Sequence, residues 1–361
     1  MTLRKPNIDV VFKALATSFS ARSTNKNVIL IIKDDTVKTF NKKVYVRSTD
    51  VTDNTNYTPA NFQAIKDCFV SNPRQVTVVR MDATDGVIAD ALATVGTLEP
   101  GYVGIASATP ADQAALAAWI KTQEEAKKSF KGIVWNPTTP PDDREVLNFT
   151  NAKVTFKDAT RGQVDGWQFI PSLLGYIAGR NIDEGADYLV MENLESVVEP
   201  TDLDTAINSG QLVLFNDSGI VRIVLGINSK TTLATDEIED MKYIEVSEAM
   251  DIIRDDITNT FKNYYIGKYK NTNNNREIFV SAIKDYFASL AGQEILSSDF
   301  NNTVQQDVDA MRQYLVSQGI DAQEMKDAEV KHQKFGRNVF IKGNIDIAEA
   351  MSDLTFTNVM N

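Results

Sequence analysis

The chain ends with Gly336-Arg-Asn-Val-Phe-Ile-Lys-Gly-Asn-Ile-Asp-Ile-Ala-Glu-Ala-Met-Ser-Asp-Leu-Thr-Phe-Thr-Asn-Val-Met-Asn361, its most informative segment. Two short strand patterns lie in it, with a turn signal between them. Leu354 and Phe356 would point one way from a strand while Thr355 and Thr357 point the other, which is the period-2 pattern of a half-buried strand. The segment therefore predicts a strand at the extreme end of the chain.

The N-terminus carries a matching fragment just after Pro6. A strand at each end of a chain can leave its own domain and complete a sheet in a neighbouring copy. We therefore predict that the two ends exchange strands between subunits. The residues predicted to do so are Ile8, Val10, Phe12, Val339, Ile341, Ile345, Ile347, Leu354 and Phe356.

Composition predicts a soluble, multidomain protein. A chain of 361 residues exceeds what one hydrophobic core usually organises, so two or three domains are expected. The net charge of −12 opposes binding to nucleic acid or anionic lipid. No apolar run has the length of a membrane span or a signal peptide, so we expect no membrane insertion and a cytoplasmic product until something releases it.

Strand and helix patterns alternate through the first half. Residues 28–32 form a wholly apolar run, predicted to be a buried strand with 44–46 as its partner. Further strands are expected at 76–80, 102–106, 132–135 and 152–156, with helices between most of them and a helix start at 142–145. This alternation predicts a mainly parallel sheet covered by helices.

The pattern changes after Ser209. A hairpin is predicted at 211–225, followed by helices at about 247–265, 279–290 and 304–315. The predicted fold class is α/β plus α+β. The predicted division is an N-terminal strand arm and linker at 1–25, a small α/β domain at 26–90, a central α/β domain at 91–235, a C-terminal helical domain at 236–335 and a C-terminal strand arm at 336–361.

Residues suited to catalysis are scarce. The chain has no glycine-rich phosphate loop, and its single cysteine, Cys68, lies in a helical pattern that predicts a buried thiol. The only histidine, His332, lies in a polar run, and the chain has no Gly-x-Ser-x-Gly motif whose serine it could activate. Asp82 and Asp85 lack the further ligands of a calcium site. We predict no catalytic residue, no metal, no cofactor and no enzyme activity.

One charged stripe supports two interpretations. Glu248, Asp251 and Asp255 lie roughly opposite the apolar stripe of the helix at 247–265. They form either a solvated face or an acidic ridge that docks a basic partner by charge complementarity.

Several segments resemble the contractile tail sheath proteins. Residues 211–232 contain Ile227-Asn-Ser-Lys-Thr231, which looks like the Ile-Asn-x-x-Thr signature of that family, and 243–268 resembles the start of its C-terminal domain. Residues 166–180 are similar to its Ala-Gly-rich helix, and 6–12 and 339–351 to its two arms. The resemblance covers nearly the whole chain in order.

The resemblance implies a multidomain sheath fold with a subtilisin-like, non-catalytic α/β domain, and a helical domain that faces an inner tube. Glu248, Asp251 and Asp255 become the tube-facing candidates. The implied partners are further copies in stacked hexameric rings, the inner tail tube protein, and baseplate and tail-terminator proteins. Contraction would drive the tube through a cell envelope, with flexible connections at 16–27 and 331–337. Assembly would take place in the bacterial cytoplasm, before release of a phage or an R-type bacteriocin (diffocin-like) particle.

Two other function classes stay open. One is a different self-assembling structural protein, such as a tube, capsid or surface-layer subunit, although a tube protein would more often be shorter and dominated by β-structure. The other is an α/β enzyme that uses carboxylates alone.

Overall fold

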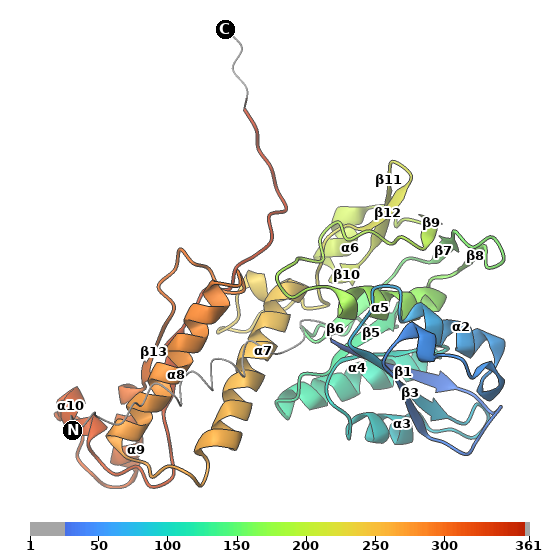
Figure 1. The fold of residues 1–361 in the computed structure, drawn as a ribbon. Coiled ribbons are helices and arrows are strands. Elements are labelled where there is room, and N and C mark those ends of the chain that lie inside the picture. Colours follow the sequence, from blue (N-terminus) through green and yellow to red (C-terminus); the bar gives the residue numbers. More distant parts are fainter. Residues whose placement is uncertain (1–25, 358–361) are drawn as a thin grey trace, which may run out of the picture. The chain divides into compact units, whose positions relative to one another are not determined.

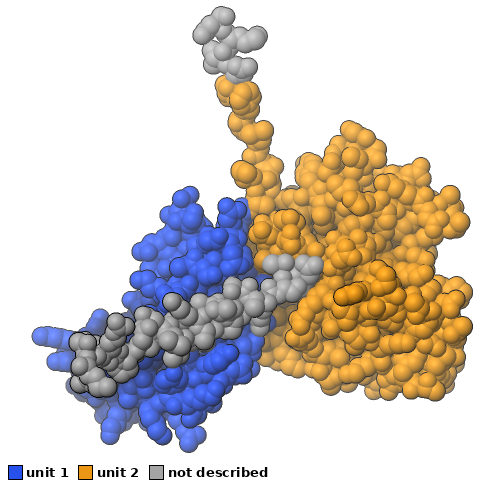
Figure 2. All heavy atoms as spheres, in the orientation of Figure 1, with its two compact units in different colours: residues 1–22, 249–349 blue, residues 23–248, 350–361 orange. Residues whose placement is uncertain are grey.

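The computed structural model describes residues 26–357, which form two compact units (Figures 1 and 2). We call residues 26–248 with 350–357 the α/β unit, and residues 249–349 the helical unit. The boundary falls inside helix α7 (Ile244–Thr260), between Glu248 and Ala249.

The α/β unit is built on a seven-stranded sheet in the order β10-β6-β5-β4-β1-β3-β2. The strands are β1 (Asn27–Lys33), β2 (Lys42–Tyr45), β3 (Gln75–Met81), β4 (Tyr102–Ile105), β5 (Lys131–Trp135), β6 (Val146–Phe149) and β10 (Gln211–Leu212). All neighbours are parallel except β2, which pairs antiparallel with β3. The predicted mainly parallel sheet is confirmed. The predicted partner of 28–32 is wrong, because β3 and β4 already occupy both edges of β1.

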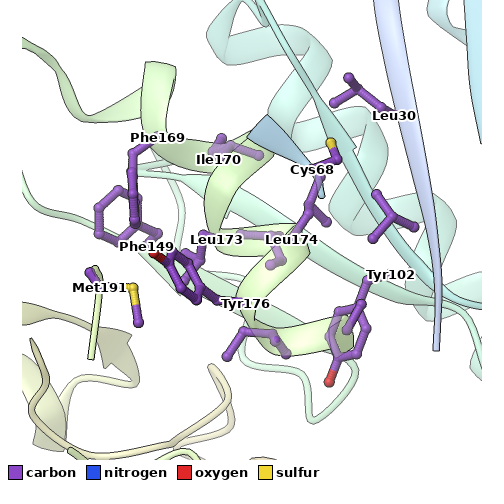
Figure 3. Packing of buried hydrophobic residues seen from close by; sticks show 14 of the residues in the cluster. Leu30, Cys68, Tyr102, Phe149, Phe169, Ile170, Leu173, Leu174, Tyr176 and Met191 are labelled. Atoms are coloured by element: carbon purple, nitrogen blue, oxygen red, sulfur yellow. The ribbon is translucent and has the colours of Figure 1, made fainter. Parts of the chain in front are cut away.

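Helices cover both faces of this sheet (Figure 1). Helices α2 (Pro59–Asp67) and α5 (Ile170–Gly179) pack on one face, and α3 (Ile88–Val95) and α4 (Pro110–Glu125) on the other. The apolar run at 28–32 lies in β1 and is buried on both faces: Leu30 enters the first core, on the side of α2 and α5, and Ile31 enters the second, on the side of α3 and α4. Figure 3 shows Leu30 in the first core with Cys68 and Leu174, so the predicted buried thiol is confirmed.

Two smaller β-structures complete this unit. A three-stranded antiparallel sheet has the order β8-β7-β9, and β11 and β12 form the predicted hairpin. Their bounds are β7 (Lys153–Phe156), β8 (Gln163–Asp165), β9 (Leu194–Val197), β11 (Leu214–Asp217) and β12 (Ile220–Ile223), with α6 (Leu203–Asn208) before β10. The helix start predicted at 142–145 is wrong, because Glu145 leads directly into β6, a strand that the prediction missed.

The helical unit begins within α7, which continues into a π-helical turn at Phe261–Tyr265. The remaining elements are α8 (Asn273–Ala291), β13 (Thr303–Gln306), α9 (Val308–Ser317), α10 (Asp327–Lys331) and β14 (Ile341–Asn344). The predicted apolar stripe of α8 is buried throughout. The predicted third helix is wrong at Val304, which lies in β13, because α9 starts only after its N-cap residue Asp307.

The sequence predicts a domain boundary at residue 90, but the observed units have no boundary there. The single large sheet takes β1, β2 and β3 from the range 26–90 and its other four strands from 91–235. Because β1 lies between β3 and β4, the two ranges share one pair of cores. The boundaries as functional domains stay a prediction.

Candidate assembly surfaces

The C-terminal segment first pairs with its own chain. Strand β14 lies antiparallel to β13, with Thr303 opposite Asn344 and Gln306 opposite Ile341. The pairing continues with a backbone hydrogen bond from Ser297 to Asp346 (2.9 Å) and another from Ala348 to Ile295 (3.1 Å). Ile341, Ile345 and Ile347, predicted to exchange between subunits, thus lie in a segment that folds back on its own body.

A buried aromatic cluster fixes the segment before β14. Phe335 is 1% exposed and contacts the rings of Tyr314 and Phe340. The guanidinium of Arg276 lies 5.1 Å from the Phe335 ring centroid, and Asn271 donates to the carbonyls of Gly336 and Asn338. These contacts pack residues 335–338 in this structure, and the flexible connection at 331–337 during contraction stays a prediction. Val339, which follows, is half-buried.

The end of the chain behaves differently. Residues 351–357 form neither helix nor strand and extend away from the body (Figure 1). Leu354 is 89% exposed and Phe356 is 79% exposed. The last anchors are a hydrogen bond from the Ala350 amide to Glu245 (2.9 Å) and one from Ser352 to Asp187. We call residues 351–357 the C-terminal tail. The predicted N-terminal exchange residues Ile8, Val10 and Phe12 lie outside the described residues.

The predicted acidic ridge is largely buried. Glu248 is 1% exposed and Asp251 is 3% exposed, with an Asp251–Arg254 ion pair of 2.8 Å. Asp255 keeps a side chain that is 30% exposed. The helical periodicity placed these residues on one stripe, but it did not reveal that Glu248, at the start of α7, is buried within the α/β unit.

Glu248 is the centre of a buried charge cluster. Its carboxylate pairs with Lys26 (2.5 Å) and with Arg180 (2.6 Å), and it accepts a hydrogen bond from the Tyr102 hydroxyl. Burial alone would raise the pKa of Glu248, but the positive charges of Lys26 and Arg180 and the hydrogen bonds outweigh it and hold the pKa at about 2. The cluster connects three elements: Lys26 lies just before β1, Arg180 is the C-cap residue of α5, and Glu248 lies in α7.

The edge where an α/β sheet usually binds ligands holds an internal ion pair instead. Such sites lie past the carboxyl ends of strands where the strand order reverses, here after β1 and β4. Lys33, which ends β1, pairs at 2.6 Å with Asp112 in the first turn of α4. Partial burial would raise the pKa of Asp112, but hydrogen bonds with Lys33 and Thr109 outweigh it and lower the pKa. Lys33 and Asp112 neutralise each other. This site therefore does not present the two neighbouring carboxylates that general acid–base catalysis would need.

The other candidate chemical groups are equally unpromising. Burial raises the pKa of the Cys68 thiol well above its ordinary value, which disfavours the reactive thiolate. His332 is exposed, as predicted. Across the described residues, no group of three or more histidine, cysteine or carboxylate side chains is placed to hold a metal ion. No helix between residues 26 and 357 is long and apolar enough to cross a bilayer.

Comparison with known proteins finds similarity to tail sheath proteins. Residues 236–361 match the phage tail sheath C-terminal domain family. A tail sheath protein of Clostridium phage phiCD119 is 29% identical over 354 residues, covering 96% of this chain and 97% of the relative. Among solved structures, the sheath tail protein of Desulfitobacterium hafniense matches with a TM-score of 0.68, 14% identity and coverage of 79% of this chain and 91% of that one. The helical sheath of the anti-feeding prophage in its contracted state matches with a TM-score of 0.70 and 13% identity, covering 100% and 98%.

Proposed function

We propose that this chain, whose residues 236–361 match the phage tail sheath C-terminal domain family, is a structural sheath subunit of a contractile injection system that polymerises by donating its C-terminal tail. The main support for polymerisation by strand donation is the C-terminal tail, in which Leu354 and Phe356 are exposed although both are large and apolar. Burying such a side chain contributes about 1.5–3 kcal/mol. A neighbouring subunit that accepts the tail would gain this stabilisation for both residues.

The β13–β14 ribbon is the proposed acceptor. It has two strands, so each strand keeps one edge without a neighbour among the described residues. An unpaired edge is a template for an added strand, and each backbone hydrogen bond gained there contributes about 0.5–1.5 kcal/mol. In this proposal Ile341, Ile345 and Ile347 stay in the parent subunit and organise the acceptor, while Leu354 and Phe356 are donated. The N-terminal residues Ile8, Val10 and Phe12 form a second donor.

The proposed particle is a stack of hexameric rings around an inner tube. Subunit bodies would rotate as rigid units during contraction while the donated strands stay paired, and the bend would fall near the boundary between residues 349 and 350. The solved baseplate of the anti-feeding prophage, which matches this fold with a TM-score of 0.65, supports a baseplate partner. Of the residues predicted to face the tube, Asp255 is the one that keeps a partly exposed side chain.

Three finer features belong to the same proposal. The α/β unit is a subtilisin-like domain without catalytic residues, which its mainly parallel sheet and two helical layers support. A tail-terminator protein ends the stack. Assembly takes place in the bacterial cytoplasm before the subunit becomes part of a phage tail or an R-type bacteriocin.

The alternation of the tail provides a matched test. We expect purified wild-type protein to form hollow striated cylinders in negative-stain microscopy, and we expect L354D/F356D to abolish them. The control T355D/T357D adds the same charge on the opposite face of the donated strand and should retain cylinders. Neither pair should alter the thermal melt of the single subunit, because Leu354 and Phe356 are exposed there. Normal cylinders from L354D/F356D would contradict the donor assignment.

A further inference from the structure

The connection from α7 to α8 presents an apolar and basic surface in an acidic protein. Within residues 262–270, which we call the basic loop, Ile266 is 57% exposed, Tyr264 is 43% exposed and Tyr269 is 41% exposed. Exposed apolar side chains that cluster in this way mark interaction sites in soluble proteins.

The basic loop rests on a packed aromatic base. Tyr265 is 7% exposed, stacks on Phe261 with ring centroids 6.2 Å apart, and packs on Phe279 at 4.6 Å. These contacts hold a π-helical turn, a distortion that is frequent at functional sites. The π-helical turn ends at Tyr265, and Gly267 follows two residues later with a φ of +76°, a conformation that glycine adopts at little steric cost. The surface is therefore presented on a fixed scaffold.

The charge of the loop contrasts with that of the whole chain. Residues 257–275 contain three lysines and no aspartate or glutamate, in a protein of net charge −12. Lys262, Lys268 and Lys270 are exposed, and no ion pair found between residues 26 and 357 uses them. Lys268 lies 5.5 Å from the ring centroid of Tyr264, so charge and apolar surface adjoin. The loop fits an acidic partner with an apolar centre.

A surface of that kind lies elsewhere on the same chain. Residues 236–240, Asp-Glu-Ile-Glu-Asp, form the acidic segment, and its central Ile238 is 56% exposed. Glu237 and Glu239 have lysine partners, Lys230 at 2.9 Å and Lys242 at 2.5 Å. Asp236 and Asp240 are exposed and take part in no ion pair of the described chain.

We propose that the basic loop of one subunit docks on the acidic segment of a second copy of this chain. The two surfaces have opposite charge, and each surrounds an exposed isoleucine. A contact between two different patches propagates from copy to copy and generates rings or helical filaments, as a sheath requires. The inference rests on the proposed function in one respect, that the chain polymerises into a sheath. It does not require that subunits exchange strands.

A charge-reversal cycle tests the contact. K262E/K268E/K270E and D236K/E239K/D240K should each weaken salt-sensitive self-association of the full chain about tenfold or more, because like charges then face each other. The combined variant restores opposite charge and should return association to within about threefold of wild type. The control K121E/K127E/K157E reverses three other exposed lysines and should stay within about threefold of wild type.

Sedimentation velocity measures this association whether or not cylinders form. Absence of cylinders from the wild-type protein would count against the proposed function, whereas the cycle decides this inference alone. Failure of the combined variant to recover association, or equal weakening by the control, would overturn it. The milder K262Q/K268Q/K270Q should show the same direction of change, and thermal melts check that each variant is folded.

Discussion

Replacing Glu248 with glutamine should destabilise the α/β unit strongly. Glu248→Gln keeps the size of the side chain but removes the negative charge between Lys26 and Arg180, and the Arg180 side chain is only 1% exposed. Leaving a buried charge without its partner costs about 3–5 kcal/mol. A glutamate whose pKa falls from 4.5 to about 2 gains about 3 kcal/mol from its charged form on folding, which agrees in size.

The tryptophans make this measurement specific. All three, Trp119, Trp135 and Trp167, lie in the α/β unit, so urea titration followed by tryptophan fluorescence reports on that unit. The control Asp165→Asn breaks an exposed ion pair with Lys153 and should change the free energy of unfolding by at most about 1 kcal/mol. Adding Arg180→Met to Glu248→Gln should recover part of the loss, because the stranded charge is then removed.

The pH dependence provides a second check. The pKa of Glu248 is depressed in the folded state, so its contribution is fully present above about pH 4.5 and is lost as pH falls toward 2. The difference in stability between wild type and Glu248→Gln should shrink over the same range. A loss no larger than that of Asp165→Asn, or a difference that does not change with pH, would refute this account of the cluster.

Two further predictions concern packing. Gly179→Ala should destabilise the α/β unit by about 1–3 kcal/mol despite the better helix propensity of alanine, because a Cβ there would lie 2.0 Å from the Ser71 carbonyl oxygen. The control Gly96→Ala, where the nearest atom to a new Cβ lies at 3.5 Å, should be neutral or stabilising in the same urea titration. Phe335→Ala should cost about 3–5 kcal/mol in the helical unit by opening a cavity beside Tyr314, and hydrogen exchange of the β14 amides should accelerate; unchanged protection of β14 would show that the aromatic cluster does not fix this segment.

Much of the architecture followed from local pattern. The apolar run at 28–32, the alternation of strands and helices and the stripe of α8 are short-range signals, because burial on both faces of a strand or one face of a helix fixes residue types at regular spacing. The resemblance to sheath proteins came from such segments in order along the chain. The same patterns missed β6, because its four residues directly follow 142–145, an acidic run after prolines that resembles a helix start.

Sequence patterns were enough to identify a mixed α/β protein with an apolar, alternating C-terminus and few residues suited to catalysis. Which part of that C-terminus is exposed depends on long-range pairing: β14 pairs with β13, which precedes it by about 40 residues, whereas Leu354 and Phe356 stay exposed in the described part of the chain. The structure also shows that Glu248, predicted as a tube-facing residue, lies at the centre of a buried charge cluster. Helical periodicity states which side chains share a stripe, but burial depends on what packs against that stripe, and Lys26, Tyr102 and Arg180 are distant in sequence.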